Sequence, residues 1–307
     1  MIIRNFLFHR VSDEVNAMWP PMKPALFSKI INHLTNKFEI VPLEGYLNQP
    51  SGFSSKKKLA TVLFDDGYKD NIEYAAPILT KFNCPASFYI VTDCINRNVP
   101  TWTYIIDDLF QNTKKEFLEL SFGFVPDNFK KLSFKLNGSP NQEVKKLKPW
   151  MKQLSNAQRV EVLNSVIEQC NDVPVSDNKM MNWDDVRQLD NAGFAIGSHS
   201  HTHPMLASLQ NESEITDELM LSASIIKKEL NKEPLTISYP IGSYDERVIR
   251  LSEAAGYQYG LAVEQQFFNK DQNNLYKIPR VELYQEPWWK QQLRISGAYS
   301  SLKKLWR

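Results

Sequence analysis

Cysteine is scarce in this sequence: Cys84, Cys94 and Cys170 are the only three among 307 residues. They form neither a CxxC pair nor an even set, so neither a disulfide framework nor a cysteine-based zinc site is expected. We expect ordinary buried thiols. That usage fits a reducing compartment, or an exported protein that does not depend on disulfides.

A charge excess and long apolar runs are also missing. Lys and Arg number 36 against 35 Asp and Glu, so no global field would attract a nucleic acid. No stretch approaches the roughly 18 apolar residues of a membrane span. Residues 1–8 are apolar but interrupted by Arg4 and Asn5, and they lack the features of a signal peptide. We therefore expect a cytoplasmic protein or one peripheral to the inner membrane face, with peripheral membrane contact left open.

Short runs rich in Ile, Val, Phe and Tyr alternate with segments of helical period, which is typical of repeated βα units around a parallel sheet. Strands are predicted near 2–8, 59–64, 86–91, 194–197, 235–239, 257–262 and 277–283. Helices are predicted near 24–35, 72–82, 183–192, 213–230 and 245–255. The length allows about two domains, but α/β barrels often use 200–250 residues in one. We interpret residues 1–307 as a single α/β barrel domain with a largely helical insertion at about 96–180.

The insertion is predicted to hold two or three polar helices and a loop. Between 129 and 152 only Glu143 opposes seven lysines: Lys130, Lys131, Lys135, Lys145, Lys146, Lys148 and Lys152. A solvated helix face is the expected explanation, and a contact surface for an anionic glycan or a lipid phosphate is the alternative. The C-terminal segment mixes aromatic and cationic residues, namely Trp288, Trp289, Lys290, Lys303, Lys304, Trp306 and Arg307. We expect terminal packing there rather than contact with a membrane or a sugar.

Histidine is also rare, yet three of the five histidines fall within five positions, at His199, His201 and His203. They follow the apolar run 193–196 and should therefore lie at the exit of a strand. Two imidazoles four residues apart can converge on one metal ion, and imidazole is a common zinc ligand. His199 and His203 have that spacing, whereas His201 should point elsewhere.

A second strand end carries adjacent carboxylates. The apolar run 59–64 ends in Asp65, Asp66 and Gly67. Neighbouring carboxylates repel each other and are costly to bury, so a structural explanation has to provide a cation or several donors. Asp-Asp-Gly alone also forms ordinary turns. Together with the two histidines, one carboxylate would complete a metal site that leaves positions open for water and substrate.

Two more strand ends are informative. The strand at 235–239 leads into a turn in which Pro240 restricts the backbone and Gly242 permits close approach, so an amide there could bind an oxyanion. The strand at 2–8 leads into His9. Parallel barrels place their active sites at the carboxyl ends of their strands. The four strand ends therefore predict one shared site.

These residues resemble the motifs of the polysaccharide deacetylase family, also called carbohydrate esterase family 4. Residues 64–67, Phe-Asp-Asp-Gly, are similar to its T-F-D-D-G motif with Leu63 in place of Thr, and residues 199–203 match H-[ST]-x-[ST]-H. Residues 238–242 are similar to R-x-P-Y-G, but Ser238 replaces Arg and Ile241 replaces the aromatic residue. The resemblance covers the chain outside the insertion.

The resemblance implies a distorted seven-stranded (β/α) barrel and a divalent ion held by Asp66, His199 and His203. Zinc is the expected ion, with cobalt or nickel as alternatives. Asp65 would be the catalytic base that accepts a proton from an activated water. The residues implied to contact the oxyanion or the substrate are Pro240, Ile241, Gly242 and Tyr244.

The family's last motif, a strand ending in a catalytic histidine, has no counterpart here because no histidine follows His203. The strand before His9 resembles rearranged members that deacetylate poly-N-acetylglucosamine, in which this histidine comes first in the chain. The barrel would then be circularly permuted, and His9 would be the catalytic acid. Arg280 is the candidate to supply the guanidinium that is missing because Ser238 replaces the arginine of the third motif. The alternative for Arg280 is a surface ion pair.

The sequence thus predicts a metal-dependent hydrolase that removes N-acetyl groups from N-acetylhexosamine units of a polysaccharide or of its lipid-linked precursor. An acetylated glycan is the expected partner. Three alternatives remain on the same scaffold: an O-acetyl esterase, a hydrolase of small cyclic amides, and a glycan-binding pseudoenzyme without activity.

Overall fold

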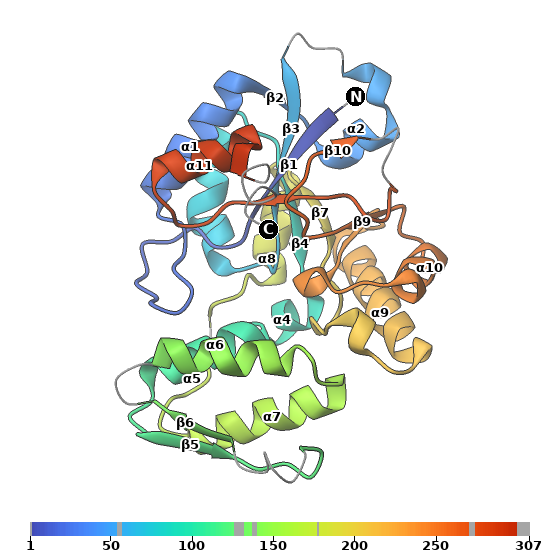
Figure 1. Cartoon of the computed structure of the whole chain (residues 1–307). Helices are drawn as coiled ribbons and strands as arrows, with labels where there is room; N and C mark the ends of the chain where they lie inside the picture. The colour runs from blue at the N-terminus through green and yellow to red at the C-terminus, as the bar shows by residue number, and fades with distance from the viewer. Residues whose placement is uncertain are drawn as a thin grey trace.

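A barrel-like sheet with helices packed around it lies above a smaller lobe in the computed structural model of the chain (Figure 1). The structure describes residues 2–53, 57–125, 132–136, 140–176, 178–269 and 274–299. The lobe contains α5–α7 and the hairpin β5–β6, which belong to the part of the chain at which the sequence analysis places an insertion.

Parallel strands form the sheet in the spatial order β1, β3, β4, β7, β8 and β9. Their bounds are Ile2–Phe8 for β1, Lys58–Phe64 for β3, Ser87–Ile90 for β4, Ala195–Ser198 for β7, Thr236–Ser238 for β8 and Tyr259–Leu261 for β9. Two short strands extend it: β2, Phe38–Ile40, pairs with β3, and β10, Phe268–Asn269, pairs antiparallel with β1.

The segment 278–283 joins the two edges of this sheet. Ile278 exchanges backbone hydrogen bonds with Gly260 and Ala262 beside β9. Further along, β11, Val281–Glu282, pairs with β1. Six strands and this segment therefore surround the centre, and the predicted distorted seven-stranded (β/α) barrel is confirmed.

The helices that cover the barrel were predicted in part. Their bounds are Pro24–Lys37 for α1, Leu43–Asn48 for α2, Ala76–Lys81 for α3, Thr92–Arg97 for α4, Trp183–Asn191 for α8, Glu212–Leu230 for α9, Glu246–Ala254 for α10 and Trp288–Ser296 for α11. A π-helical turn, η2 (Asn71–Ala75), precedes α3, and short 3-10 turns lie at η1 (Pro50–Gly52), η4 (Leu206–Ser208) and η5 (Pro240–Gly242). The five helices predicted for the barrel correspond to α1, to η2 with α3, and to α8, α9 and α10, whereas α2, α4 and α11 were not predicted.

Buried phenylalanines set the register at the end of the sheet that carries the site. Phe8, Phe64 and Phe88 are paired neighbours on β1, β3 and β4. Their rings stack with centroids 5.4 Å and 4.8 Å apart. Because the three rings are aligned, the next residues along the strands are brought side by side, and the Asp65 amide donates to the Phe8 carbonyl at 3.1 Å. The apolar core thereby positions His9 next to Asp65.

The insertion differs from the expectation of polar helices joined by a loop. Besides α5 (Trp102–Asn112), α6 (Pro140–Met151) and α7 (Asn156–Gln169), it contains an antiparallel pair, β5 (Phe117–Leu120) and β6 (Leu132–Lys135). These strands alternate exposed and buried residues, and an apolar cluster separate from the barrel core includes Leu118, Phe134 and Leu147. An isolated two-stranded sheet is marginally stable and depends on packing of its apolar face against other elements. Because that packing involves distant residues, the two short strands could not be predicted from their own sequences. Lys130 and Lys131 lie outside the described residues.

The expected packing of the C-terminal aromatic residues is confirmed in part. Trp288 packs edge-on against His33, with ring centroids 5.2 Å apart, whereas Trp289 is exposed. Lys303, Lys304, Trp306 and Arg307 lie outside the described residues. None of the helices in the described ranges combines the length and the apolar composition needed to cross a bilayer.

Candidate active site

The carboxyl ends of the barrel strands open into a cavity of about 340 Å³. Strand ends contribute His9, Asp65, Asp66, His199, His203 and Ile241 to its lining. The insertion contributes Thr103, Asp107, Lys148 and Lys152. The four strand ends singled out in the sequence therefore do meet at one site, and the insertion forms a second wall of that site.

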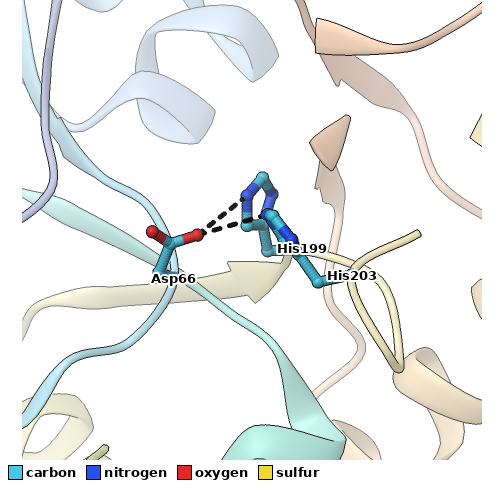
Figure 2. Close-up of side chains that lie close together, drawn as sticks. All are labelled: Asp66, His199 and His203. Carbon is cyan, nitrogen blue, oxygen red and sulfur yellow. Dashed lines mark ion pairs between the residues drawn. The ribbon is translucent and has the colours of Figure 1, made fainter. Parts of the chain in front are cut away.

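Three of these side chains converge on one point (Figure 2). Asp66 Oδ1 lies 3.3 Å from His199 Nε2 and 3.4 Å from His203 Nε2, and all three residues are buried. A tetrahedral zinc ion with bonds of roughly 2.1 Å has ligand atoms about 3.4 Å apart. The spacing and the donor types thus fit a divalent ion held by the three predicted ligands.

A backbone carbonyl orients His199, and burial keeps His203 neutral. His199 Nδ1–H donates to the Ser238 carbonyl at 2.7 Å, which leaves Nε2 facing Asp66. Such a second hydrogen bond is usual for an imidazole that ligates a metal. Burial lowers the pKa of His203 to about 3 despite the nearby charge of Asp66, so this ring is neutral, the form that binds metal.

Serine and threonine in the histidine motif hold the loop in place. The Ser200 hydroxyl accepts the His203 amide at 3.1 Å. Thr202 donates through its backbone and its hydroxyl to Glu218. His201 turns away from the site, because its Nδ1 lies 2.9 Å from the Thr92 hydroxyl. It is not part of the three-ligand group, as expected.

Left-handed backbone conformations gather at the site. Asp66, Ser200, His203 and Ile241 have φ of 77°, 65°, 60° and 58°. Such conformations cost of order 1–3 kcal/mol each, and a β-branched residue such as Ile241 adopts them least readily. Four of them in one site indicate that the surrounding fold imposes this geometry.

Asp65 stands beside the metal group without belonging to it. Arg280 Nη1 donates to its Oδ1 at 2.8 Å and the Ser238 hydroxyl donates to its Oδ2 at 3.1 Å. Burial alone would raise the pKa of Asp65, but the charge of Arg280, with those of His199 and His9, lowers it below the usual value. The side chain is thus kept as a carboxylate. Because Arg280 is fully buried, its ion pair is not a surface pair.

His9 also lines the cavity, at the end of β1 and next to Asp65 along the sheet edge. Its Nδ1 is 3.5 Å from Glu282 Oε1, and its ring meets Trp19 edge-on at 5.6 Å between centroids. Sequence reasoning missed Glu282. Arg280 and Glu282 alternate in a predicted strand, and residues two apart on a strand face the same side, so the pattern carried a usable signal.

The turn after β8 brings Ile241 to the cavity. Within this turn the Gly242 amide donates to the Tyr239 carbonyl and the Ser243 amide donates to the Pro240 carbonyl. The Ile241 amide takes part in neither of these two hydrogen bonds. The structure does not bring Tyr244 to the cavity: its hydroxyl donates to Glu264 at 2.7 Å and its ring stacks on Tyr239.

The insertion residues at the site could not be found from the sequence, because nothing in the chain indicates which face of the barrel the lobe covers. Lys148 and Lys152 belong to the lysine-rich stretch between 129 and 152, but their part in the cavity becomes visible only in the fold.

Comparison with known proteins identifies the family. The family model described as polysaccharide deacetylase matches residues 53–133 and 138–260, which is more than half of the chain. The chain belongs to the polysaccharide deacetylase family. The match includes Asp65, Asp66, His199 and His203, whereas His9 and Arg280 lie outside it.

Relatives and solved structures agree with this membership. YxkH of Bacillus subtilis (strain 168), named for the same family, is 30% identical over 101 residues, which are 32% of this chain and 34% of YxkH. The match therefore spans about a third of that relative. The deacetylase PplD of Streptococcus pyogenes, solved in complex with acetate, superposes with a TM-score of 0.63 at 15% identity over 96% of this chain and 97% of that one.

Two further structures share the fold. IcaB from Ammonifex degensii gives a TM-score of 0.62 at 12% identity over 96% of this chain and 97% of its own. A de-N-acetylase from Aggregatibacter actinomycetemcomitans gives 0.60 at 16% identity, over 94% of this chain and 97% of its own. At these identities the similarity shows the fold.

Proposed function

We propose that this deacetylase family member is a metal-dependent hydrolase that removes N-acetyl groups from N-acetylhexosamine units of a polysaccharide or of its lipid-linked precursor. One observation carries the proposal: the buried group Asp66, His199 and His203 lies beside a carboxylate, Asp65, that Arg280 holds in its charged form. The names of the structural relatives, which include a de-N-acetylase and a deacetylase bound to acetate, point the same way.

A bound ion would supply an activated water and a Lewis-acid contact for the acetyl oxygen. Zinc is the proposed ion, with cobalt or nickel as alternatives, since two imidazoles and one carboxylate suit all three. Asp65 accepts the proton of the attacking water, and this requires a carboxylate that remains ionised. Its pairing with Arg280 and Ser238 maintains that state at the lining of the cavity.

Two groups complete the proposed chemistry. The Ile241 amide donates to the oxygen that becomes negative during attack, a contribution of about 3–4 kcal/mol for a well-placed donor. The turn residues Pro240 and Gly242 hold that amide, and we propose that Tyr244 acts indirectly by supporting the turn. His9 donates a proton to the departing amine, which would otherwise leave poorly as an anion.

The place of His9 in the chain supports a circular permutation. The strand–histidine unit at residues 2–9 precedes the matched family region, which begins at residue 53. We propose that β1 occupies the position of the strand that ends in the catalytic histidine in other members. The rearranged poly-N-acetylglucosamine deacetylases, which this part of the sequence resembles, have the same order.

The decisive experiment measures acetate release from N-acetylglucosamine oligomers by the zinc-loaded protein. Asp65→Asn should lower kcat by about 10²–10⁴-fold while retaining the ion. His199→Ala should lose both the ion, as measured by elemental analysis, and the activity. His201→Ala, a change inside the same motif but outside the ligand group, is the matched control and should retain both.

Three outcomes would separate the alternatives. Release of acetate from O-acetylated but not N-acetylated sugars would identify an esterase. Hydrolysis of small cyclic amides alone would move the substrate away from glycans. An ion retained without any hydrolysis would identify a glycan-binding pseudoenzyme and overturn the proposal.

A further inference from the structure

The wall that the insertion contributes to the cavity is built from two helices. Thr103 and Asp107 lie on α5, Lys148 lies on α6, and Lys152 follows directly after α6. Figure 1 shows α6 on the side of the lobe that faces the barrel. The insertion therefore places two ammonium groups opposite the strand ends that carry the catalytic residues.

Most charges that line the cavity already have partners. Lys148 Nζ contacts both carboxylate oxygens of Asp107, at 2.8 and 2.7 Å, and Asp107 is buried. On the barrel side Asp65 pairs with Arg280, and Glu282 lies next to His9. Asp66 is committed to the metal group. Glu282 is also close enough to raise the pKa of Lys152, but no ion pair joins these two side chains within the described ranges.

Lys152 is the lysine of the cavity lining that has no acidic partner among the described residues. Its side chain makes no hydrogen bond or ion pair with any residue in the described ranges, and it is exposed. Partial burial in the wall and the nearby charge of Lys148 lower the pKa of Lys152, while Glu282 acts in the opposite direction. Because Asp107 already compensates the charge of Lys148, the ammonium of Lys152 is the one that an anion in the cavity would pair with.

We propose that Lys152, supported by Lys148, binds an anionic substituent of the glycan, a carboxylate or a phosphate close to the acetyl group that is removed. This inference rests on the proposed deacetylase function and names its substrate class: an acidic acetylated glycan. A lysine suits this task because its ammonium is a point charge on a flexible stem and can follow anions of different shape. Lys152 is then a specificity-determining residue, while the reacting groups remain on the barrel.

Another lysine on α6 provides a matched control. Lys146 pairs with Glu143 at 2.7 Å, is exposed and does not line the cavity. Lys146→Gln removes one positive charge from α6, and Lys152→Gln removes one positive charge just after the end of α6. A general effect of positive charge on the lobe would appear in both variants, whereas a contact inside the cavity would appear only at Lys152.

The test compares three β-linked N-acetylglucosamine tetramers: an unsubstituted one, one with a C6 carboxylate and one with a C6 phosphate. The zinc-loaded wild-type protein should prefer at least one acidic tetramer in kcat/KM. Lys152→Gln should lower the ratio of acidic to neutral kcat/KM about five- to tenfold, mainly through KM, and Lys152→Arg should restore it. Lys146→Gln should leave the ratio as in the wild type. Whichever acidic tetramer shows the loss identifies the anion.

The opposite results would overturn the inference. A wild-type preference for the neutral tetramer, or a ratio that Lys152→Gln leaves unchanged, would show that Lys152 does not read an anion. Calorimetric binding of the same tetramers keeps this question separate from catalysis: if no tetramer is hydrolysed, the proposed function fails, yet tighter binding of an acidic tetramer that is lost in Lys152→Gln still supports the contact. Equal binding of all three tetramers rejects it.

Discussion

Arg280 Nη1 lies 2.8 Å from Asp65 Oδ1, although 215 positions separate the two residues. The segment that closes the barrel brings the guanidinium from the C-terminal part of the chain to the end of β3. Both side chains are removed from water, so each compensates a charge that would otherwise be costly to bury. A pair of this kind keeps Asp65 ionised and makes the closing segment part of the candidate active site.

Removal of Arg280 should destabilise the fold more than removal of a surface charge. Arg280→Gln leaves Asp65 buried without its partner, and we expect the free energy of unfolding to fall by about 3–5 kcal/mol. The double variant with Asp65→Asn should recover part of that loss. Urea unfolding measures both effects, with Arg250→Gln, which breaks an exposed pair with Glu212, as the control at about 0.2–1 kcal/mol. Additive losses in the double variant would contradict the proposed coupling.

The loss of activity on removing His9 should be larger for a substrate whose leaving group needs a proton. His9→Ala should lower kcat for N-acetylglucosamine oligomers by about 10²–10⁴-fold. With 4-nitrophenyl acetate, whose leaving group departs as a stable anion, the loss should be much smaller. His33→Ala alters a histidine that packs on Trp288 away from the cavity and should change neither rate. Equal losses on both substrates would argue against an acid role for His9.

Gly242 should be required for activity as well as for stability. Its φ is +69°, and a Cβ there would come within 3.1 Å of Val263. Gly242→Ala should cost about 1–2 kcal/mol of stability and displace the neighbouring Ile241 amide, which lowers kcat. Gly193 has a φ of +88° with open space around it, so Gly193→Ala should cost similar stability and leave kcat intact. Loss of activity in both variants would point to a general effect of destabilisation.

The buried thiols should be unreactive and should weaken the fold in alkali. Burial raises the pKa of Cys84 to about 12, against 9.0 for a free thiol, and burial also raises the pKa of Cys94 and Cys170. Between these pKa values the unfolded chain releases thiol protons that the folded chain retains, so the free energy of unfolding falls as pH rises above about 9. Cys84→Ala should make that decline shallower. At pH 8 a disulfide reagent should label the native protein only after unfolding, and rapid labelling would contradict the burial of the thiols.

The barrel strands could be predicted from the sequence because their signals are local. The apolar run before Asp65 and the run before His9 each form a strand that ends within a residue of the predicted position. The spacing of His199 and His203 also carries its meaning within five residues, since it indicates a shared ligand. Because parallel barrels place their active sites at the carboxyl ends of the strands, these aspartates and histidines could be expected at one site.

Other relationships could not be read from local patterns. Glu282 meets His9 only because the closing segment pairs with β1, and the hairpin β5–β6 depends on packing against its own lobe. The presence of Lys148 and Lys152 in the same cavity as the proposed catalytic residues depends on how the insertion packs onto the barrel.

The sequence by itself determined the main parallel strands, most of the barrel helices and the chemical types of the candidate ligands, because propensity, apolar period and motif spacing act over a few residues. The tertiary structure decided that Arg280 is buried against Asp65, that Tyr244 lies outside the cavity and that the insertion supplies a charged wall. These features depend on contacts between distant segments, whose geometry is set by the packing of the whole domain.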